Sequence, residues 1–253
     1  MRASQASEPR ARSGDRVAGR LEPPLIRYHM SLAEMVDITR GDLEVTRRVA
    51  ERECTERWDL KWCIDRGVPN EALAYATHIE MATAQSIGGL RTLMRSLRDL
   101  PERKTVVVIS GGLFATDQIG GRGDVSDLIS AVGQEAARAN VNLYALHLDT
   151  KFIEMFSPRA RALPSMFRDL NMWAMGLERF AGTAGGELIR VQAGTGDYAF
   201  ERVLLETSAY YLLGVEPAPS DRDGRVHHVT VKVARRDAVV RSRAWVVVPA
   251  AGG

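Results

Sequence analysis

The sequence lacks any long apolar run. No segment approaches the ~20 consecutive apolar residues that a membrane-spanning helix needs, so we expect no membrane span. The first twenty residues, MRASQASEPRARSGDRVAGR, are polar and arginine-rich and contain no apolar core. They therefore do not match a secretory signal peptide, and we expect disorder at least to Gly14.

Lysine is also scarce. Only four lysines occur among the 34 basic residues, and the arginines are scattered among 32 acidic residues, for a formal net charge of +2. Proteins that bind nucleic acid carry a dense basic stripe, which is missing here. We therefore expect no nucleic-acid binding. A hydrophobic content of 45% and a charged content of 26% are typical of a soluble globular protein with a full core.

Cysteine is limited to Cys54 and Cys63, in the stretch ECTERWDLKWC. Two thiols do not make a zinc site, which needs four ligands. Two interpretations stay open: two reduced core thiols, or a disulfide that closes a short loop. In the chain-entropy model such a disulfide stabilises the fold by roughly 3 kcal/mol. It would also place the protein in an oxidising compartment.

Established catalytic motifs are missing as well. The chain contains neither a G-x-S-x-G nucleophile elbow nor an H-E-x-x-H zinc motif. The turn that begins at Ser110 lacks the Gly-Lys-Ser/Thr ending of a phosphate-binding loop. His147 and Asp149 are the only acid–base pair predicted near that turn. An α/β enzyme, a hydrolase or a transferase, that uses this strand-end edge is therefore the alternative function.

The tripeptide Arg-Gly-Asp occurs twice, at Arg40–Asp42 and at Arg122–Asp124. Such tripeptides are adhesive in some animal proteins. Here each aspartate directly precedes a predicted helix. A glycine turn followed by a helix N-cap accounts for both copies.

The residues that are present predict helices first and then an alternation of strands and helices. The stretch SLAE is a capping box that begins a helix at Ser31. Asn70 is placed to cap a long helix, whose apolar residues recur every three or four positions as far as Pro101. The consecutive apolar residues of Thr105–Ser110 predict a strand that is buried on both faces, as in a parallel sheet.

The alternation continues to the C-terminus. Strands are predicted at VNLYALHLD, ELIRVQ and YYLLGVEP, with helices between them. This order predicts an α/β fold with a doubly wound, mostly parallel sheet. From residue 217 to 249, alternating valines predict an antiparallel C-terminal hairpin with a tight RRDA turn, which extends one edge of the sheet.

The segments LPERKTVVVISGGL, VNLYALHLD, LERFAGTAGGELIRVQ and YYLLGVEP, in this order, resemble the second half of a von Willebrand factor A domain. More narrowly, they are similar to the VWFA-related domain of acidobacteria and other bacteria. The stretch RGDLEVTRRVAERECTERWDLKWC resembles a cysteine-bearing insertion of some members. The resemblance implies a domain over 25–249, with a helical insertion at 25–69, preceded by a disordered or remnant segment at 1–24. It implies a non-enzymatic, protein-binding function.

The resemblance also implies a place for a metal ion. In this family the loop after the Thr105–Ser110 strand lies at a metal-ion-dependent adhesion site, where Mg²⁺ is held by oxygen ligands that include an upstream Asp-x-Ser-x-Ser. No Asp-x-Ser-x-Ser occurs in this chain. Ser110 and Asp117 are the remaining, weak candidate ligands. We therefore expect Mg²⁺ only if an upstream segment supplies that motif.

The first strand of the family has no counterpart in this sequence. We expect the chain to be an N-terminally truncated product or to have a mis-assigned start, with a full-length form that is periplasmic or extracellular. A sheet without that strand exposes a hydrophobic edge that is prone to association.

We expect a protein partner to bind at the loops Ser110–Asp124 and Asp149–Pro164. The stretch TKFIEMFSPRARALPSMF combines aromatic and methionine side chains with arginines, which are enriched at interfaces. The alternative is that this stretch covers the protein's own core. The candidate contact residues are Phe152, Met155, Phe156, Arg159, Arg161, Met166 and Phe167.

Overall fold

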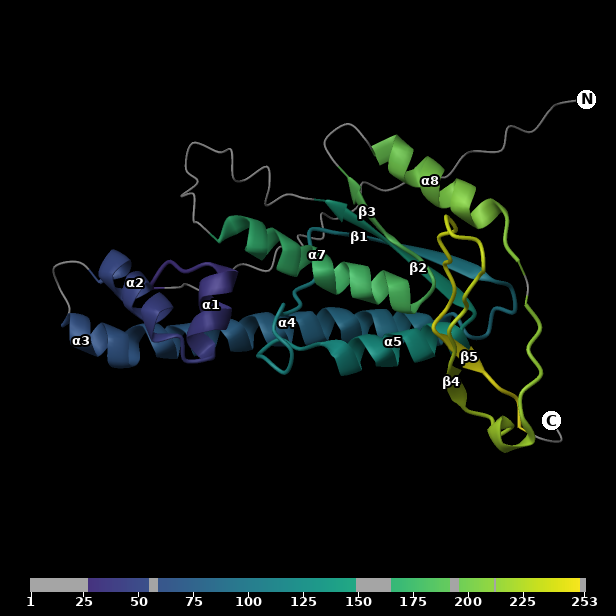
Figure 1. Cartoon of the computed structure of the whole chain (residues 1–253), viewed down its shortest axis with the longest axis horizontal. Helices are drawn as coiled ribbons and strands as arrows, with labels where there is room; N and C mark the ends of the chain where they lie inside the picture. Colours follow the sequence, from purple (N-terminus) through teal and green to yellow (C-terminus); the bar gives the residue numbers. More distant parts are fainter. Residues whose placement is uncertain (1–26, 55–58, 149–164, 192–195, 212, 251–253) are drawn as a thin grey trace, which may run out of the picture.

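A computed structural model describes residues 27–54, 59–148, 165–191, 196–211 and 213–250. The fold is mixed α/β, with a three-stranded parallel sheet and a separate two-stranded antiparallel sheet (Figure 1). None of the described helices is both long enough and apolar enough to cross a membrane. The elements are α1 (Leu32–Thr39), α2 (Leu43–Glu53), α3 (Leu60–Trp62), η1 (Cys63–Gly67), α4 (Val68–Ser96), β1 (Lys104–Ser110), α5 (Ser126–Arg138), β2 (Val141–Leu148), α7 (Met166–Thr183), β3 (Leu188–Val191), α8 (Gly196–Ser208), η2 (Pro219–Asp221), β4 (Val226–His228) and β5 (Trp245–Val247).

The parallel sheet has the order β1-β2-β3. Its register pairs Lys104 with Val141 at one end of β1 and Ser110 with His147 at the other. β2 is buried along nearly its whole length, as its apolar sequence predicts. The prediction that β1 is buried on both faces is wrong, because Ile109 is 55% exposed. The reason is position: β1 pairs with one described neighbour, whereas β2 lies between two.

Helices cover the two faces of the sheet unequally. α4, α5 and α7 bury one face, where Val106 and Val108 pack against a core that includes Leu143 and Phe180. α8 covers part of the other face by packing Ala199 on β2 and β3. The sheet is therefore fully layered over β2 and β3, but β1 is left half covered on the α8 side.

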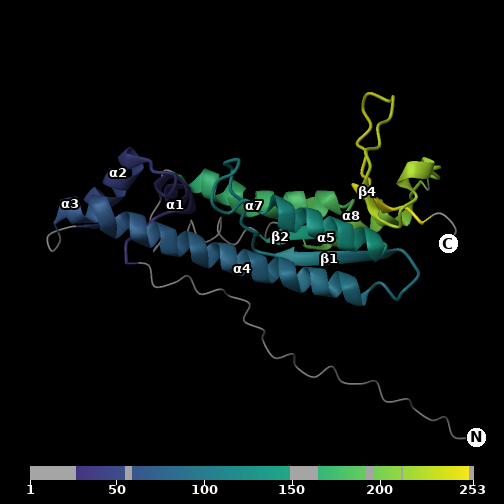
Figure 2. The same cartoon turned by 90° about the horizontal axis from the view of Figure 1, so that it is seen from below.

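The long helix α4 links this sheet to a helical unit formed by α1, α2, α3 and η1, and Figure 2 shows both lying along it. The prediction that Asn70 caps α4 is wrong. The helix begins at Val68, without a side-chain cap, directly after η1. The N–H of Val68 already donates to the carbonyl of Cys63, so the preceding turn supplies the acceptor that a cap would otherwise provide.

The helical unit has a core of its own, which includes Met35, Val36 and Val49. The capping box at Ser31 is confirmed, because Glu34 and Ser31 bond reciprocally at the start of α1. Asp42 caps α2 by accepting from the backbone N–H groups of the second and third helical residues, each at 3.0 Å. Local capping signals thus determine both helix starts.

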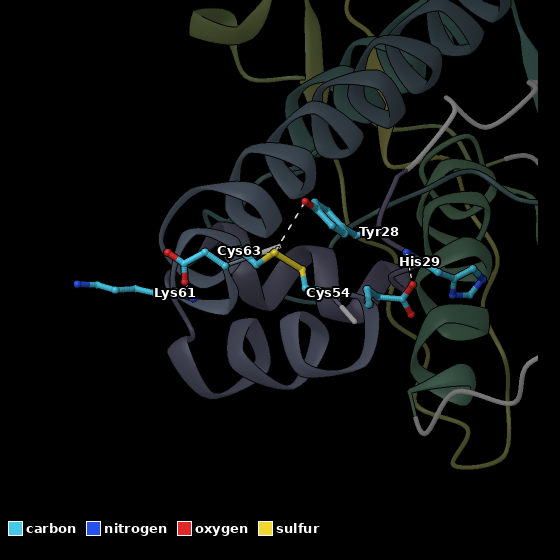
Figure 3. Close-up of a disulfide and its surroundings, with 7 residues drawn as sticks. Tyr28, His29, Cys54, Lys61 and Cys63 are labelled. Carbon is cyan, nitrogen blue, oxygen red and sulfur yellow. Dashed lines mark hydrogen bonds between the residues drawn. A yellow bond between two sulfur atoms is a disulfide. The ribbon is translucent and has the colours of Figure 1, made fainter. Parts of the chain in front are cut away.

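Cys54 and Cys63 form a disulfide, which confirms the second of the two interpretations of the cysteine pair. The bond joins the end of α2 to the start of η1, and both cysteines are buried (Figure 3). The Tyr28 hydroxyl lies 4.0 Å from the sulfur of Cys63. The cross-link therefore holds α2 against the base of α4 in the interior of the helical unit.

The C-terminal antiparallel pair is confirmed, but its extent and its position differ from the prediction. β4 and β5 are short and form a sheet of their own, so they extend no edge of the parallel sheet. Trp245 instead packs against α5, where a Cβ on Gly133 would come within 2.8 Å of the Trp245 ring. The alternating valines beyond β4 and the described residues of YYLLGVEP form no strand. Val233 and Val239 stay exposed, because no second layer covers them.

Replacing both cysteines, as Cys54→Ser/Cys63→Ser, tests the contribution of the cross-link. We expect the free energy of unfolding to fall by about 3 kcal/mol, because the unfolded chain regains the entropy of an open loop. Urea denaturation followed by circular dichroism measures this difference. Wild type in reductant is the control and should show the same fall; an unchanged transition in both would contradict the prediction.

Candidate functional site

At the C-terminal end of β1 the chain turns sharply through two glycines. The Ser110 hydroxyl donates to the carbonyl of Gly112 at 3.0 Å and accepts from the N–H of the same residue at 3.1 Å. Gly112 has a φ of +144°, and a Cβ there would come within 2.9 Å of Trp173 on α7. The turn therefore requires glycine, and the serine hydroxyl is used to close it.

His147 lies opposite Ser110 in the register of β1 and β2. Its Nε2 is 3.3 Å from the carbonyl oxygen of Gly111, and the side chain is buried. The hydroxyl and the imidazole thus both bond to the backbone of the same turn. Asp149, the other member of the predicted acid–base pair, lies outside the described residues.

A three-residue ion-pair network lies beside this turn. Arg168, in the first turn of α7, binds Asp117 through two nitrogens at 2.6 and 3.1 Å. It binds Asp37 of α1 in the same two-pronged way, at 2.6 and 2.9 Å. Both carboxylates raise the pKa of the Arg168 guanidinium, and Arg168 in turn lowers the pKa of Asp117. One side chain thus joins α1, α7 and the loop after β1.

The next residue, Asp169, also binds α1, but at its N-terminal end. Its carboxylate accepts from the N–H of Leu32 at 3.3 Å and from that of Ala33 at 2.9 Å, at the N-terminus of α1. Burial raises the pKa of Asp169 to about 6, in spite of these two hydrogen bonds. The neighbouring Ser165 hydroxyl donates to Ser31, the N-cap of α1, at 2.7 Å. The first turn of α7 is therefore the docking point of the helical unit.

The two weak candidate ligands do not fit a magnesium site. Both oxygens of Asp117 are engaged by Arg168, and the Ser110 hydroxyl is closed onto its own turn. In the part of the chain that the structure describes, no three His, Cys, Asp or Glu side chains are grouped so as to hold a metal ion. A cation at this loop would have to displace a charged arginine.

A cleft of about 710 Å³ lies between the loop after β1, the end of α1 and the middle of α4. The arginines of both Arg-Gly-Asp tripeptides line it. The Arg122 guanidinium donates two hydrogen bonds to the Glu80 carboxylate of α4, at 2.9 and 2.6 Å, whereas Arg40 donates to the side chain of Gln118. The cleft is lined by Thr39, Arg40, Glu80, Ala84, Ile119, Gly120, Gly121, Arg122, Gly123, Asp124, Val125 and Leu128.

The structural interpretation of the two tripeptides is confirmed in one case and modified in the other. Gly41 and Gly123 have φ values of +89° and +79°, so both are glycine turns. Asp42 is a helix N-cap. Asp124 is not, because Val125 holds that position in α5. The Asp124 carboxylate instead accepts from the N–H and the hydroxyl of Ser126, at 3.0 and 2.6 Å.

Of the predicted contact residues, two lie within the described part of the chain. Met166 and Phe167 form the start of α7, and the Phe167 ring is 70% exposed beside Arg168. The stretch predicted as a loop is thus helical at this end. The other five, Phe152, Met155, Phe156, Arg159 and Arg161, lie outside the described residues.

Sequence reasoning missed Asp37, Arg168 and Asp169. Arg168 and Asp37 are 131 positions apart, and nothing in either segment marks them as partners. The charge types alone could not identify them, because the chain holds 34 basic and 32 acidic residues. Only the docking of α1 on α7 brings them together.

Comparison with protein-family models, with curated proteins and with solved structures finds no match. The candidate site is therefore defined by its own geometry. It consists of the exposed Phe167, the ion-pair network of the adjacent Arg168 and the closed turn after β1.

Arg168→Ala tests the network. We expect it to lower the free energy of unfolding by about 1–3 kcal/mol, because Asp37 and Asp117 lose the donors that compensate their partly buried charges. Thermal and urea unfolding measure the change. Arg47→Ala, which removes an exposed ion pair on α2, is the matched control and should leave stability unchanged. Equal effects of the two substitutions would contradict this role of Arg168.

Asp169→Asn tests the buried cap through pH dependence. Because the pKa of Asp169 is raised from 3.8 to about 6, the folded protein retains a proton between these values that the unfolded chain releases. This group therefore makes the folded state less stable as pH rises through that window. We expect the free energy of unfolding of wild type, minus that of the variant, to fall from pH 4 to pH 6 and then level off. Urea titrations at several pH values measure it, and a difference that is flat with pH would refute the assignment.

Proposed function

We propose that this chain is a non-enzymatic protein-binding module of the von Willebrand A type, which binds its partner around Phe167. The parallel order β1-β2-β3, with helices on both faces, supports the doubly wound class. Open sheets of that class bind ligands at the carboxyl ends of their strands. The first turn of α7 contacts the loop that leaves this end of β1, through Arg168 and Asp117.

The observation that carries the proposal is an exposed aromatic ring on a fixed turn. Phe167 is 70% exposed, although the residues on its C-terminal side are anchored to α1 by Arg168 and Asp169. A rigid aromatic side chain loses little conformational entropy when a partner covers it. An anchored Phe beside an arginine therefore has the composition of an interface centre rather than that of an ordinary solvated surface.

The proposed binding is independent of a metal ion. In the loop that supplies a Mg²⁺ ligand in the resembling family, the one carboxylate that we considered in this chain, that of Asp117, is paired with Arg168. The Arg168 guanidinium supplies the positive charge that would otherwise come from a cation. Adhesion would then rest on the apolar Phe167 surface and on hydrogen bonds, without a coordinated carboxylate of the partner.

We also propose that the protein acts in the periplasm or outside the cell. The Cys54–Cys63 disulfide supports this location, because disulfides persist in oxidising compartments and are rare in the cytosol. A partner would then be another exported protein.

Phe167→Asp tests the proposed surface. Tagged wild type should capture a defined protein from the periplasmic or secreted fraction of its own cells, and we expect at least roughly tenfold less capture by the variant, the loss typical of an interface centre. Leu43→Asp, which alters another exposed apolar residue, should capture as wild type does. Capture should also survive EDTA. Equal capture by Phe167→Asp would contradict the proposal that Phe167 is the contact surface. Loss of capture in EDTA would contradict binding without a metal ion.

A further inference from the structure

The outer edge of β1 carries backbone groups that pair with no described strand. The N–H of Lys104 donates to the carbonyl of Asn140, on the β2 side, at 2.9 Å. In a parallel pair each residue directs its N–H and C=O to the same side, and successive residues alternate. Thr105, Val107 and Ile109 therefore direct their N–H and C=O groups to the outer edge.

Apart from Lys104 at its start, this edge has none of the features that normally keep edge strands from pairing. Between Lys104 and Ser110 the residues are Thr, Val, Val, Val and Ile, without a proline, a charge or a bulge. Ile109 is 55% exposed, and Thr105 is exposed as well. An unprotected, β-branched edge of this kind is a template for pairing with another chain.

Helix α4 packs on the other face of β1, the one that carries Val106 and Val108, and it also exposes apolar side chains. Arg95 of α4 and Arg98, just beyond the end of the helix, both donate to Glu135 of α5, so this flank of α4 faces α5. Leu93 lies on the opposite flank, two positions from Arg95 at about 100° per residue, and is 42% exposed. Leu100, which follows the helix, is 50% exposed. Figure 2 shows α4 and β1 running alongside each other at the lower side of the sheet unit.

We propose that a second copy of this chain covers this surface, with β1 pairing antiparallel to β1 of the other copy about a two-fold axis at Val107. The parallel sheet would then continue from one copy into the other. This inference is independent of the proposed function, because the Phe167 surface lies on α7.

The edge is self-complementary in this register. Val107 faces Val107, Thr105 faces Ile109, and Lys104 faces Ser110 rather than another lysine. The residues that face each other at the edge exchange both backbone hydrogen bonds, as in a hydrogen-bonded antiparallel pair. β-branched side chains opposite one another stabilise such a pair, and no like charges oppose each other. The same two-fold axis places the exposed Leu93 flanks of the two α4 helices on the same side of the joined sheet.

The test is the mass in solution of wild type and of charge variants at the edge, measured by light scattering after size-exclusion chromatography. Wild type should have twice the 27.9 kDa mass of one chain. Thr105→Lys/Ile109→Lys places lysine opposite lysine in both outer pairs. It should raise the dissociation constant of the dimer at least roughly tenfold and give monomer at the same concentration. Both positions are exposed, so the fold of one chain should be kept, as circular dichroism can verify.

Two further variants make the result specific for this register. Thr105→Lys/Ile109→Glu places opposite charges across the axis and should restore the dimer. Leu73→Lys, a lysine at an exposed site in the part of α4 that carries the helical unit, should leave the dimer intact. The proposal is overturned if wild type is a monomer at all concentrations, because the edge is then covered by other residues or by a different partner. A dimer that persists in Thr105→Lys/Ile109→Lys overturns it equally.

Discussion

The structure depends most on the pair of side chains at the start of α7. Arg168 forms ion pairs with Asp37 and Asp117, and Asp169 accepts from two backbone N–H groups at the start of α1, so two adjacent residues join the helical unit, the sheet and the loop after β1. Each interaction is partly buried, and a partly buried charge is costly unless it is paired. The α1 dipole favours the Asp169 carboxylate at its N-terminus, whereas burial opposes the charge. The position of α7 is thus specified by electrostatics as well as by apolar packing.

These interactions also occupy polar side chains in the loop at the C-terminal end of β1. Because Asp117 is bonded to Arg168 and the Ser110 hydroxyl to its own turn, these two polar groups stabilise the loop and are not available to a cation. Phe167 stands exposed beside the network that anchors its helix. The proposed protein-binding role rests on this exposed ring, which offers contact area to a partner.

A second constraint is the exposed side of the parallel sheet. Parallel strands are normally covered by helices on both faces and paired with a strand on both edges. Among the described residues, β1 pairs with a strand on one edge only, and one of its faces is partly exposed. β2, which does, is buried nearly throughout. The contrast between two strands of similar composition shows that their environment, and not their residue types, sets their burial. An unpaired, β-branched edge of this kind also favours pairing with another chain.

Much of the local structure could be predicted from the sequence, because it depends on neighbouring residues. The capping box at Ser31, the cap at Asp42 and the strand that ends at Ser110 all follow from short-range geometry. The close spacing of the two cysteines made their disulfide one of two open interpretations.

Predictions failed where residues outside the segment itself determine its structure. Asn70 is not a cap because the preceding turn supplies the acceptor, and the C-terminal valines lack a second layer. The sequence by itself determined the order of the main helices and strands as far as α8, and the glycine turns, which are local. Only the tertiary structure decided that Arg168 joins two acids, one of them 131 positions away, that β1 lies at an edge and that Phe167 is exposed, since each depends on what packs alongside.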